Sequence, residues 1–90
     1  MKRYYIIYKG RVQGVGFRWK LINIARRYGL TGYAKNLYNG DVEVEVQGNS
    51  GLKEFINDSL SNDRFIEIED YSIKEIPVDE DERDFDVKYY

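Results

Sequence analysis

A strict alternation of apolar and acidic residues in the middle of the chain constrains the fold more than any other feature. Within residues 41–47, Val42, Val44 and Val46 alternate with Glu43 and Glu45. Successive side chains of a strand point to opposite faces of the sheet. The segment therefore predicts a strand with one buried face and one solvated face.

The part of the chain before this strand predicts a strand, a glycine-containing loop, a helix and a second strand. The first strand is apolar on both faces in its middle, which is typical of a central strand. The helix has apolar residues at three-to-four spacing, and Gly29 is expected to end it because glycine adopts the left-handed conformation cheaply. Asn39-Gly40 predicts a hairpin turn. The expected ranges are 3–12 for the first strand, 13–17 for the loop, 18–28 for the helix and 30–37 for the second strand.

The part after residue 47 predicts a helix and two further strands. Ser50 is expected to cap a helix whose apolar stripe runs through residues 52–60. Residues 64–76 are extended, but two pairs of apolar residues are out of step by one position around Asp70. A bulge, or a loop before the true strand, explains this shift, and we favour a strand that begins near Asp70 and ends at Pro77. Residues 85–89 alternate again and predict a short last strand.

This order of elements, β-α-β-β-α-β with a terminal strand, predicts a fold of the α+β class. It matches the ferredoxin-like sandwich, an antiparallel sheet with two helices on one face. Right-handed crossovers place the first and third strands in the centre of the sheet. We expect residues 1–90 to form a single domain, because a chain of 90 residues has room for one core.

Several classes of function are excluded by missing residue types. The chain has no Cys and no His, so disulfides, thiol nucleophiles, imidazole bases and histidine or cysteine metal ligands are all absent. The longest apolar run, residues 4–8, is too short to cross a membrane. We therefore expect a soluble cytoplasmic protein that does not bind membranes.

The charges are unevenly distributed between the two parts of the chain. Residues 1–37 contain nine basic side chains and no acidic one, whereas residues 38–90 contain five basic and sixteen acidic side chains. The first part is suited to an anionic ligand, but two oppositely charged parts that attract each other in the fold would give the same pattern. The acidic run 79–86 is predicted to be a solvated loop.

The loop before the first helix has the features of an anion-binding site. Residues 10–18 spell GRVQGVGFR. Gly14 and Gly16 allow the backbone to curve around a ligand, and the first amides of the helix have no internal partner. Arg18 adds a planar group that matches two phosphate oxygens. The alternative is a tight turn in which the glycines serve geometry and Arg18 is solvated.

These residues resemble the first signature of the acylphosphatase family. A second signature of the family is matched by residues 32–36, GYAKN, followed by Gly40, Val42 and Gly48 at the usual spacing. The resemblance covers essentially the whole chain, with Tyr8 at a position where an aliphatic residue is usual. It implies hydrolysis of an acyl phosphate to a carboxylate and inorganic phosphate, without metal or organic cofactor.

The resemblance also implies roles for individual residues. Arg18 corresponds to the phosphate-binding arginine and Asn36 to the asparagine that orients the attacking water. The missing acid and base fit this reaction, because a carboxylate with a pKa near ~4 leaves without a proton. The phosphate cradle falls on the backbone amides of Gly14, Val15, Gly16, Phe17 and Arg18.

Other side chains near these motifs are expected to have no catalytic part. If residues 30–37 are extended, Lys35 points away from Asn36. Trp19, Tyr33 and Tyr38 are predicted to be packing or rim aromatics. The residues predicted to be solvated charges, or at most to attract an anionic substrate, are Lys9, Arg11, Lys20 and Lys35.

Two other functions remain open at this point. An acylphosphatase-like domain could bind an anion, or serve a larger protein, without turnover. An RNA-binding module of the same architecture would carry aromatic residues on the open face of the third strand, where Glu43 and Glu45 stand instead. We therefore expect a monomer that binds an acyl phosphate and is inhibited by inorganic phosphate, with no nucleic-acid partner.

Overall fold

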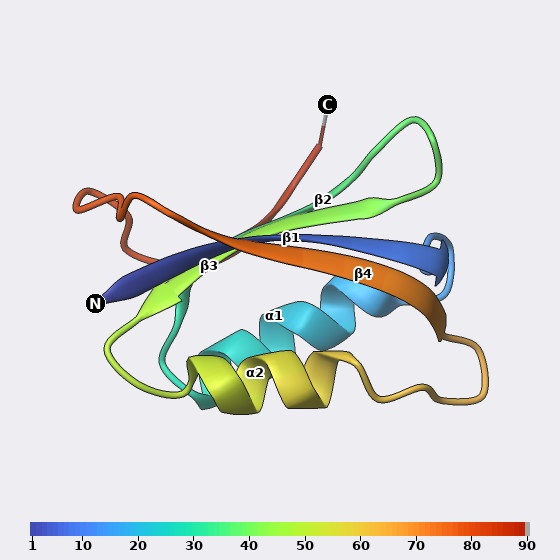
Figure 1. Cartoon of the computed structure of the whole chain (residues 1–90). Helices are drawn as coiled ribbons and strands as arrows, with labels where there is room; N and C mark the ends of the chain where they lie inside the picture. The colour runs from blue at the N-terminus through green and yellow to red at the C-terminus, as the bar shows by residue number, and fades with distance from the viewer. Residues whose placement is uncertain (90) are drawn as a thin grey trace.

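The chain alternates between strands and two helices in the predicted order (Figure 1). The computed structural model describes residues 1–89. The first helix begins at Phe17 and ends at Arg27, one residue earlier at each end than the sequence predicted. The elements are β1 (Lys2–Arg11), α1 (Phe17–Arg27), β2 (Thr31–Asn36), β3 (Val42–Gly48), α2 (Leu52–Ser59), β4 (Glu67–Ile76) and β5 (Phe85–Lys88).

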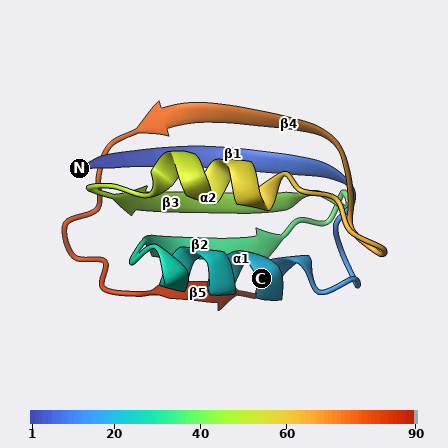
Figure 2. The same cartoon turned by 90° about the horizontal axis from the view of Figure 1, so that it is seen from below.

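The strands form one five-stranded sheet in the order β4-β1-β3-β2-β5 (Figure 2). The pairs β1–β3, β1–β4 and β2–β3 are antiparallel, and β1 and β3 lie in the interior of the sheet as predicted. The terminal strand β5 pairs parallel to β2 and forms the edge beyond it. Both helices lie on one face, so the expected ferredoxin-like α+β sandwich is confirmed.

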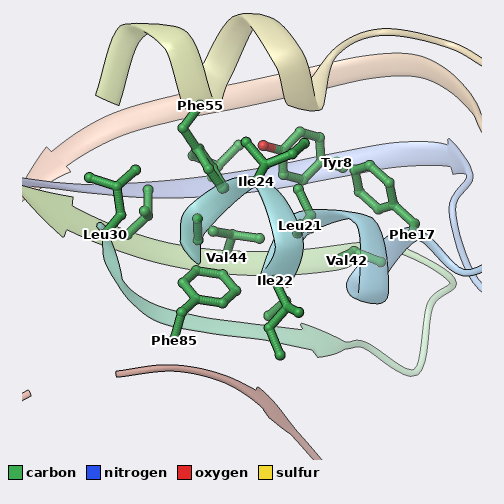
Figure 3. Close-up of a cluster of buried hydrophobic side chains, with 14 of the residues drawn as sticks. Tyr8, Phe17, Leu21, Ile22, Ile24, Leu30, Val42, Val44, Phe55 and Phe85 are labelled. Carbon is green, nitrogen blue, oxygen red and sulfur yellow. The ribbon is translucent and has the colours of Figure 1, made fainter. Parts of the chain in front are cut away.

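The hydrophobic core fills the space between the helices and the sheet (Figure 3). The predicted buried face of β3 is confirmed, because Val42, Val44 and Val46 are fully buried. Tyr8, the unusual residue in β1, is also fully buried, and its hydroxyl donates a hydrogen bond of 2.7 Å to Ser59 Oγ. The Phe17 ring packs edge-on against Tyr8, with 4.9 Å between ring centroids. This contact anchors the first turn of α1, immediately before Arg18.

Two local predictions after β3 are wrong. Ser50 does not cap α2, because Gly51 in the left-handed conformation precedes the helix and no side chain caps it. The strand β4 begins at Glu67 rather than near Asp70. The register shifts between Lys9 and Gly10 of β1, which pair with Asp70 and Ile68. The phase change in the sequence is therefore a bulge inside the strand, and pairing continues on both sides of it.

Residues 79–84 of the acidic run lie outside the strands and are mostly exposed, as predicted for a solvated loop, but Asp79 and Glu82 attach this loop to the sheet. Arg3 is only 4% exposed, and its guanidinium donates to both carboxylate oxygens of Glu82 at 2.9 and 3.0 Å. Gln47 exchanges two hydrogen bonds with the backbone of Asp79. Attraction between the basic and acidic parts of the chain thus accounts for some of the charge asymmetry.

The face of the sheet opposite the helices carries a network of tyrosines and glutamates. The Tyr5 hydroxyl donates to Glu43 at 2.6 Å, and the Tyr33 hydroxyl lies 2.9 Å from Glu43 and 2.8 Å from Glu45. Lys88 sits over the Tyr33 ring, 4.2 Å from its centroid. Tyr33 is therefore a packing residue of the open face, as predicted.

This network makes the fold sensitive to high pH. The hydrogen bond to Glu43 raises the pKa of Tyr5 to about 12, from an unfolded value near ~10. The neutral hydroxyl is favoured in the fold, so its contribution to stability is complete below pH ~10 and is lost as the pH rises through about 12. We expect the ultraviolet titration of Glu43→Gln to show one tyrosine that ionises at a lower pH than it does in the wild type. The variant Tyr5→Phe shows which part of the titration curve belongs to Tyr5. A curve for Glu43→Gln that coincides with the wild-type curve would contradict the coupling of Tyr5 to Glu43.

Candidate active site

The loop between β1 and α1 turns through two left-handed glycines. Gly14 has a φ of 73° and Gly16 a φ of 80°, conformations that side-chain-bearing residues rarely adopt. A β-carbon at either position would meet no atom within 4 Å, so the requirement lies in the backbone and not in crowding. Replacement by alanine would therefore strain the loop itself.

The first turn of α1 leaves amides available to a ligand. The first backbone hydrogen bond of the helix is donated by Lys20 to the Gly16 carbonyl, at 3.0 Å. The amides of residues 17–19 precede it and have no partner within the helix. No side chain caps this end and no acidic residue stands in the first turn. The positive end of the helix dipole is thus free to act on an anion.

A hollow of about 190 Å³ lies at this end of the helix. One side is formed by the loop and the first turn of α1, and the other by β5 and the residue that follows it. The lining residues are Val12, Gly14, Gly16, Phe17, Arg18, Trp19, Val87 and Tyr89.

Arg18 brings a positive charge to this hollow without a carboxylate partner. Within residues 1–89, none of the ion pairs involves Arg18. Its guanidinium carbon lies 5.3 Å from the centroid of the Tyr89 ring, a cation–π contact. The guanidinium is therefore held beside the hollow with its hydrogen-bond donors available for a ligand.

Asn36 ends β2 on the face of the sheet that carries the helices. It pairs with the buried Val42, whereas Lys35 pairs with Glu43 on the open face, so the two side chains point in opposite directions as expected. The Asn36 Oδ1 atom is buried and accepts no hydrogen bond within residues 1–89. A buried acceptor without a donor costs about 1–3 kcal/mol, and such a cost is typical of functional sites.

Gln13 connects the loop to the turn that follows Asn36. Its Nε2 donates to the carbonyls of Leu37 at 2.7 Å and Asp41 at 2.8 Å. The two segments that the sequence analysis singled out are thus tied together at one end of the sheet. Sequence reasoning gave Gln13 no role, although it lies within the first motif. Its partners are 24 and 28 residues away, and no spacing rule identifies them.

The structure brings together most, but not all, of the predicted site. Gly14, Gly16, Phe17 and Arg18 share the hollow. Val15 does not line it, because its side chain packs against the core. Asn36 lies outside the lining as well, at the neighbouring end of β2. Their roles in binding and catalysis stay predictions.

Comparison with known proteins identifies the family. The family model described as acylphosphatase matches residues 4–87. This chain belongs to the acylphosphatase family. It is 41% identical over 90 residues to an acylphosphatase of Clostridium beijerinckii, with 99% of this chain and 100% of that protein covered. The crystal structure of acylphosphatase from Bacillus subtilis matches with a TM-score of 0.92 and 34% identity, and covers 99% of this chain and 100% of that chain.

An acylphosphatase-like fold also occurs inside a longer protein. The crystal structure of T. kodakarensis HypF is 37% identical to this chain, with a TM-score of 0.85. The match covers 98% of this chain but only 12% of HypF. The two acylphosphatases above differ from it in this respect, since the matches cover 100% of each of those chains.

The charges around the acylphosphatase hollow are only partly solvated. Lys9 is exposed, as predicted, but it also forms an ion pair of 2.7 Å with Asp41. Lys20 donates to the Ser61 carbonyl, which ties α1 to the end of α2. Arg11 is exposed, as is Tyr38.

Two features are not found among the residues that the structure describes. Among residues 1–89, the acidic side chains form no cluster of three or more that could hold a metal ion. None of the helices in the same range has the length and apolar character needed to cross a bilayer.

The tether from Gln13 is expected to set the phosphate affinity of this acylphosphatase. In Gln13→Ala the loop loses two hydrogen bonds, each worth about 0.5–1.5 kcal/mol. A cost of about 1.4 kcal/mol in holding the loop weakens binding about tenfold. We therefore expect the inhibition constant of inorganic phosphate to rise about tenfold, measured against acetyl phosphate hydrolysis.

Gln47→Ala is a matched control for this prediction. Gln47 also ties a loop to the sheet through two hydrogen bonds, but it does so at the opposite end of β3. It should lower thermal stability and leave the phosphate inhibition constant unchanged. Equal effects of the two variants on phosphate binding would show that the tether acts through global stability alone.

Proposed function

We propose that the protein hydrolyses acyl phosphates without a metal ion, by holding the phosphoryl group in the loop 14–18 and directing water with Asn36. The observation that carries this proposal is the guanidinium of Arg18, which has no ion pair within residues 1–89, beside a loop with two left-handed glycines and helix amides without intrahelical partners. Family membership supports the reaction. The chemistry of these residues supports the roles that we assign to them.

Binding of the phosphoryl group would use backbone and guanidinium donors together. The amides of Gly14, Val15, Gly16, Phe17 and Arg18 supply donors that need no side chain. The Arg18 guanidinium offers two parallel donors to two phosphate oxygens. Among residues 1–89, no carboxylate lines the hollow, so the described lining offers nothing that repels a dianion. Donors fixed before the reaction stabilise the charge that builds on the equatorial oxygens.

Water attack would need orientation and not a strong base. The Asn36 carboxamide offers an acceptor for a water proton and stays neutral beside the dianion. The water oxygen bonds to phosphorus as the bond from phosphorus to the acyl oxygen breaks. The carboxylate leaves with the electron pair and needs no proton. The water proton passes to a phosphate oxygen, so the products are a carboxylate and inorganic phosphate.

Metal independence is supported by the donor set at the site. The chain has no His and no Cys, and the hollow lining offers backbone, aliphatic, aromatic and guanidinium groups. Divalent cations prefer carboxylate, carbonyl and water oxygens gathered in one place. A guanidinium at the centre of the site repels a cation and attracts a phosphate.

The competing functions have less support. A non-catalytic accessory domain would not need Asn36, whose buried acceptor without a partner is costly in a merely structural role. Single-stranded RNA would meet Glu43 and Glu45 on the open face, where their carboxylates repel phosphates.

Hydrolysis of acetyl phosphate and benzoyl phosphate in excess EDTA tests the proposal directly. We expect turnover of both, unaffected by EDTA, with competitive inhibition by inorganic phosphate. No hydrolysis would favour the accessory domain. Hydrolysis that EDTA abolishes would refute metal independence, and non-competitive inhibition would place the phosphate at another site.

We also propose that residues 1–90 act as one domain, as a monomer in the cytoplasm. The exposed edge strand β4 carries Glu67, Glu69, Asp70 and Glu75 against a single Lys74. Such an excess of one charge discourages pairing between two copies at this edge. Sedimentation equilibrium tests the monomer, and a stable dimer would contradict it.

A further inference from the structure

Two exposed aromatic side chains stand at the mouth of the phosphate hollow. Trp19 is 66% exposed and Tyr89 is 76% exposed, and both line the hollow. Exposing a large aromatic ring to water is unfavourable, and exposed apolar surface commonly marks a binding site. Neither residue belongs to the loop 14–18, and the proposed phosphate chemistry uses them only through the contact of Tyr89 with Arg18.

The position of Tyr89 relative to Arg18 fixes how close these rings are to the reacting bond. The guanidinium carbon of Arg18 lies 5.3 Å from the Tyr89 ring centroid. A phosphoryl group bound to the guanidinium of Arg18 is therefore separated from the Tyr89 ring only by that guanidinium. Trp19 follows Arg18 in the first turn of α1, and the inward-facing Val87 of β5 completes the apolar side of the hollow.

The size of the hollow determines where the acyl group must go. A cavity of about 150 Å³ holds one benzene ring. The hollow, about 190 Å³, must also hold the phosphoryl group, so an acyl group larger than acetyl has to extend to the mouth. A single oxygen separates the phosphorus from the acyl carbon in the substrate. The acyl group consequently meets the surface formed by Trp19, Val87 and Tyr89.

We propose that Trp19, Val87 and Tyr89 form an acyl-binding surface that makes the enzyme select aromatic over short aliphatic acyl phosphates. This inference rests on the proposed function. An aromatic acyl group can stack on the Trp19 and Tyr89 rings and cover Val87, whereas an acetyl group reaches little of this surface. The loop and Arg18 grip the phosphate of either substrate equally, so the discrimination arises from these three residues.

The ratio of kcat/KM for benzoyl phosphate to that for acetyl phosphate tests the inference. We expect the ratio to exceed one in the wild type and to fall about tenfold in Trp19→Ala, with a smaller fall in Tyr89→Leu. Phe65→Ala is the matched control, since Phe65 is 60% exposed but does not line the hollow. It should keep the wild-type ratio.

A binding experiment with stable phosphonates gives a readout that does not depend on turnover. Trp19 is the only tryptophan of the chain, so its fluorescence reports on this surface alone. We expect phenylphosphonate to change the emission and, in the same titration, to bind more tightly than methylphosphonate. In Trp19→Ala, which lacks the fluorophore, calorimetric titration should show the preference for phenylphosphonate reduced about tenfold.

The outcomes separate this inference from the proposed function. If the wild type hydrolyses neither substrate, the proposed function fails. If it hydrolyses both and the ratio and phosphonate preference are unchanged in Trp19→Ala and Tyr89→Leu, only the acyl-binding surface is overturned. A change in oligomeric state in Trp19→Ala with an unchanged ratio would overturn it too, because the ring would then serve a contact between two copies.

Discussion

Arg18→Ala is expected to lower kcat/KM for acetyl phosphate about 10²–10³-fold, which is typical of losing one preorganised donor to transition-state charge. The guanidinium has no carboxylate partner within residues 1–89, so its removal leaves no unpaired charge in the protein. The loss should therefore appear in catalysis and binding, with little change in thermal stability. Because the same group holds the ground-state phosphate, the inhibition constant of inorganic phosphate should rise at least about tenfold.

Arg27→Ala provides the matched control for this variant. Arg27 lies on the same helix, is 64% exposed and has one long ion pair of 3.8 Å with Asp58. It removes the same charge from α1 without touching the hollow, so kcat/KM should stay within about twofold. A second variant, Arg18→Lys, keeps the charge but loses the planar pair of donors, and should recover only part of the activity. Full activity of Arg18→Ala would refute our account of phosphate binding.

The periodicities of the sequence predicted the fold because each element has one apolar face that must be buried. Val42, Val44 and Val46 alternate so regularly that only one register buries all three against the helices. The apolar residues that are out of step around Asp70 indicated a bulge. They did not indicate whether the residues before the bulge pair with the neighbouring strand. The pairing of these residues depends on Gly10 of β1, which lies about sixty residues away in the sequence and pairs with Ile68.

The site was predictable where one short motif contains it and unpredictable where distant segments meet. Gly14, Gly16 and Arg18 lie within five residues, so loop geometry and helix start could be read together. The tether from Gln13 and the contact of Tyr89 with Arg18 join segments separated by 24 or more residues. Such contacts follow from the order of strands in the sheet and not from any local spacing.

The charge asymmetry is another feature whose role depends on contacts between distant residues. The sequence left open whether the basic first part serves a ligand or the fold, and the structure divides these residues between the two. Arg3 and Lys9 are paired with Glu82 and Asp41. Arg18 is free of ion pairs within residues 1–89 and stands at the hollow. Net charge by segment cannot make this distinction, because it depends on which carboxylates reach each basic group.

Asn36→Ala is expected to lower kcat about 10²-fold and to leave the phosphate inhibition constant within about twofold of wild type. The carboxamide positions the water and does not hold the phosphate, and misplacement of a reacting group by about 1 Å can cost such a factor. The substitution Asn36→Ala should lower activity without lowering the stability of the fold. The Oδ1 atom is buried without a donor, which costs about 1–3 kcal/mol, so removing it should keep or raise the melting temperature.

Two further variants decide whether Asn36 acts through water or through local structure. Asn36→Asp keeps the shape but places a carboxylate beside the phosphate, so it should weaken phosphate binding as well as slow turnover. Asn23→Ala removes an exposed amide from α1 and should change neither activity nor stability. A fall in activity together with a lower melting temperature in Asn36→Ala would mean that the residue supports the fold. Full activity in Asn36→Ala would mean that the water is oriented by another group, since a loop and a guanidinium alone supply donors for the phosphate but no acceptor for the attacking water.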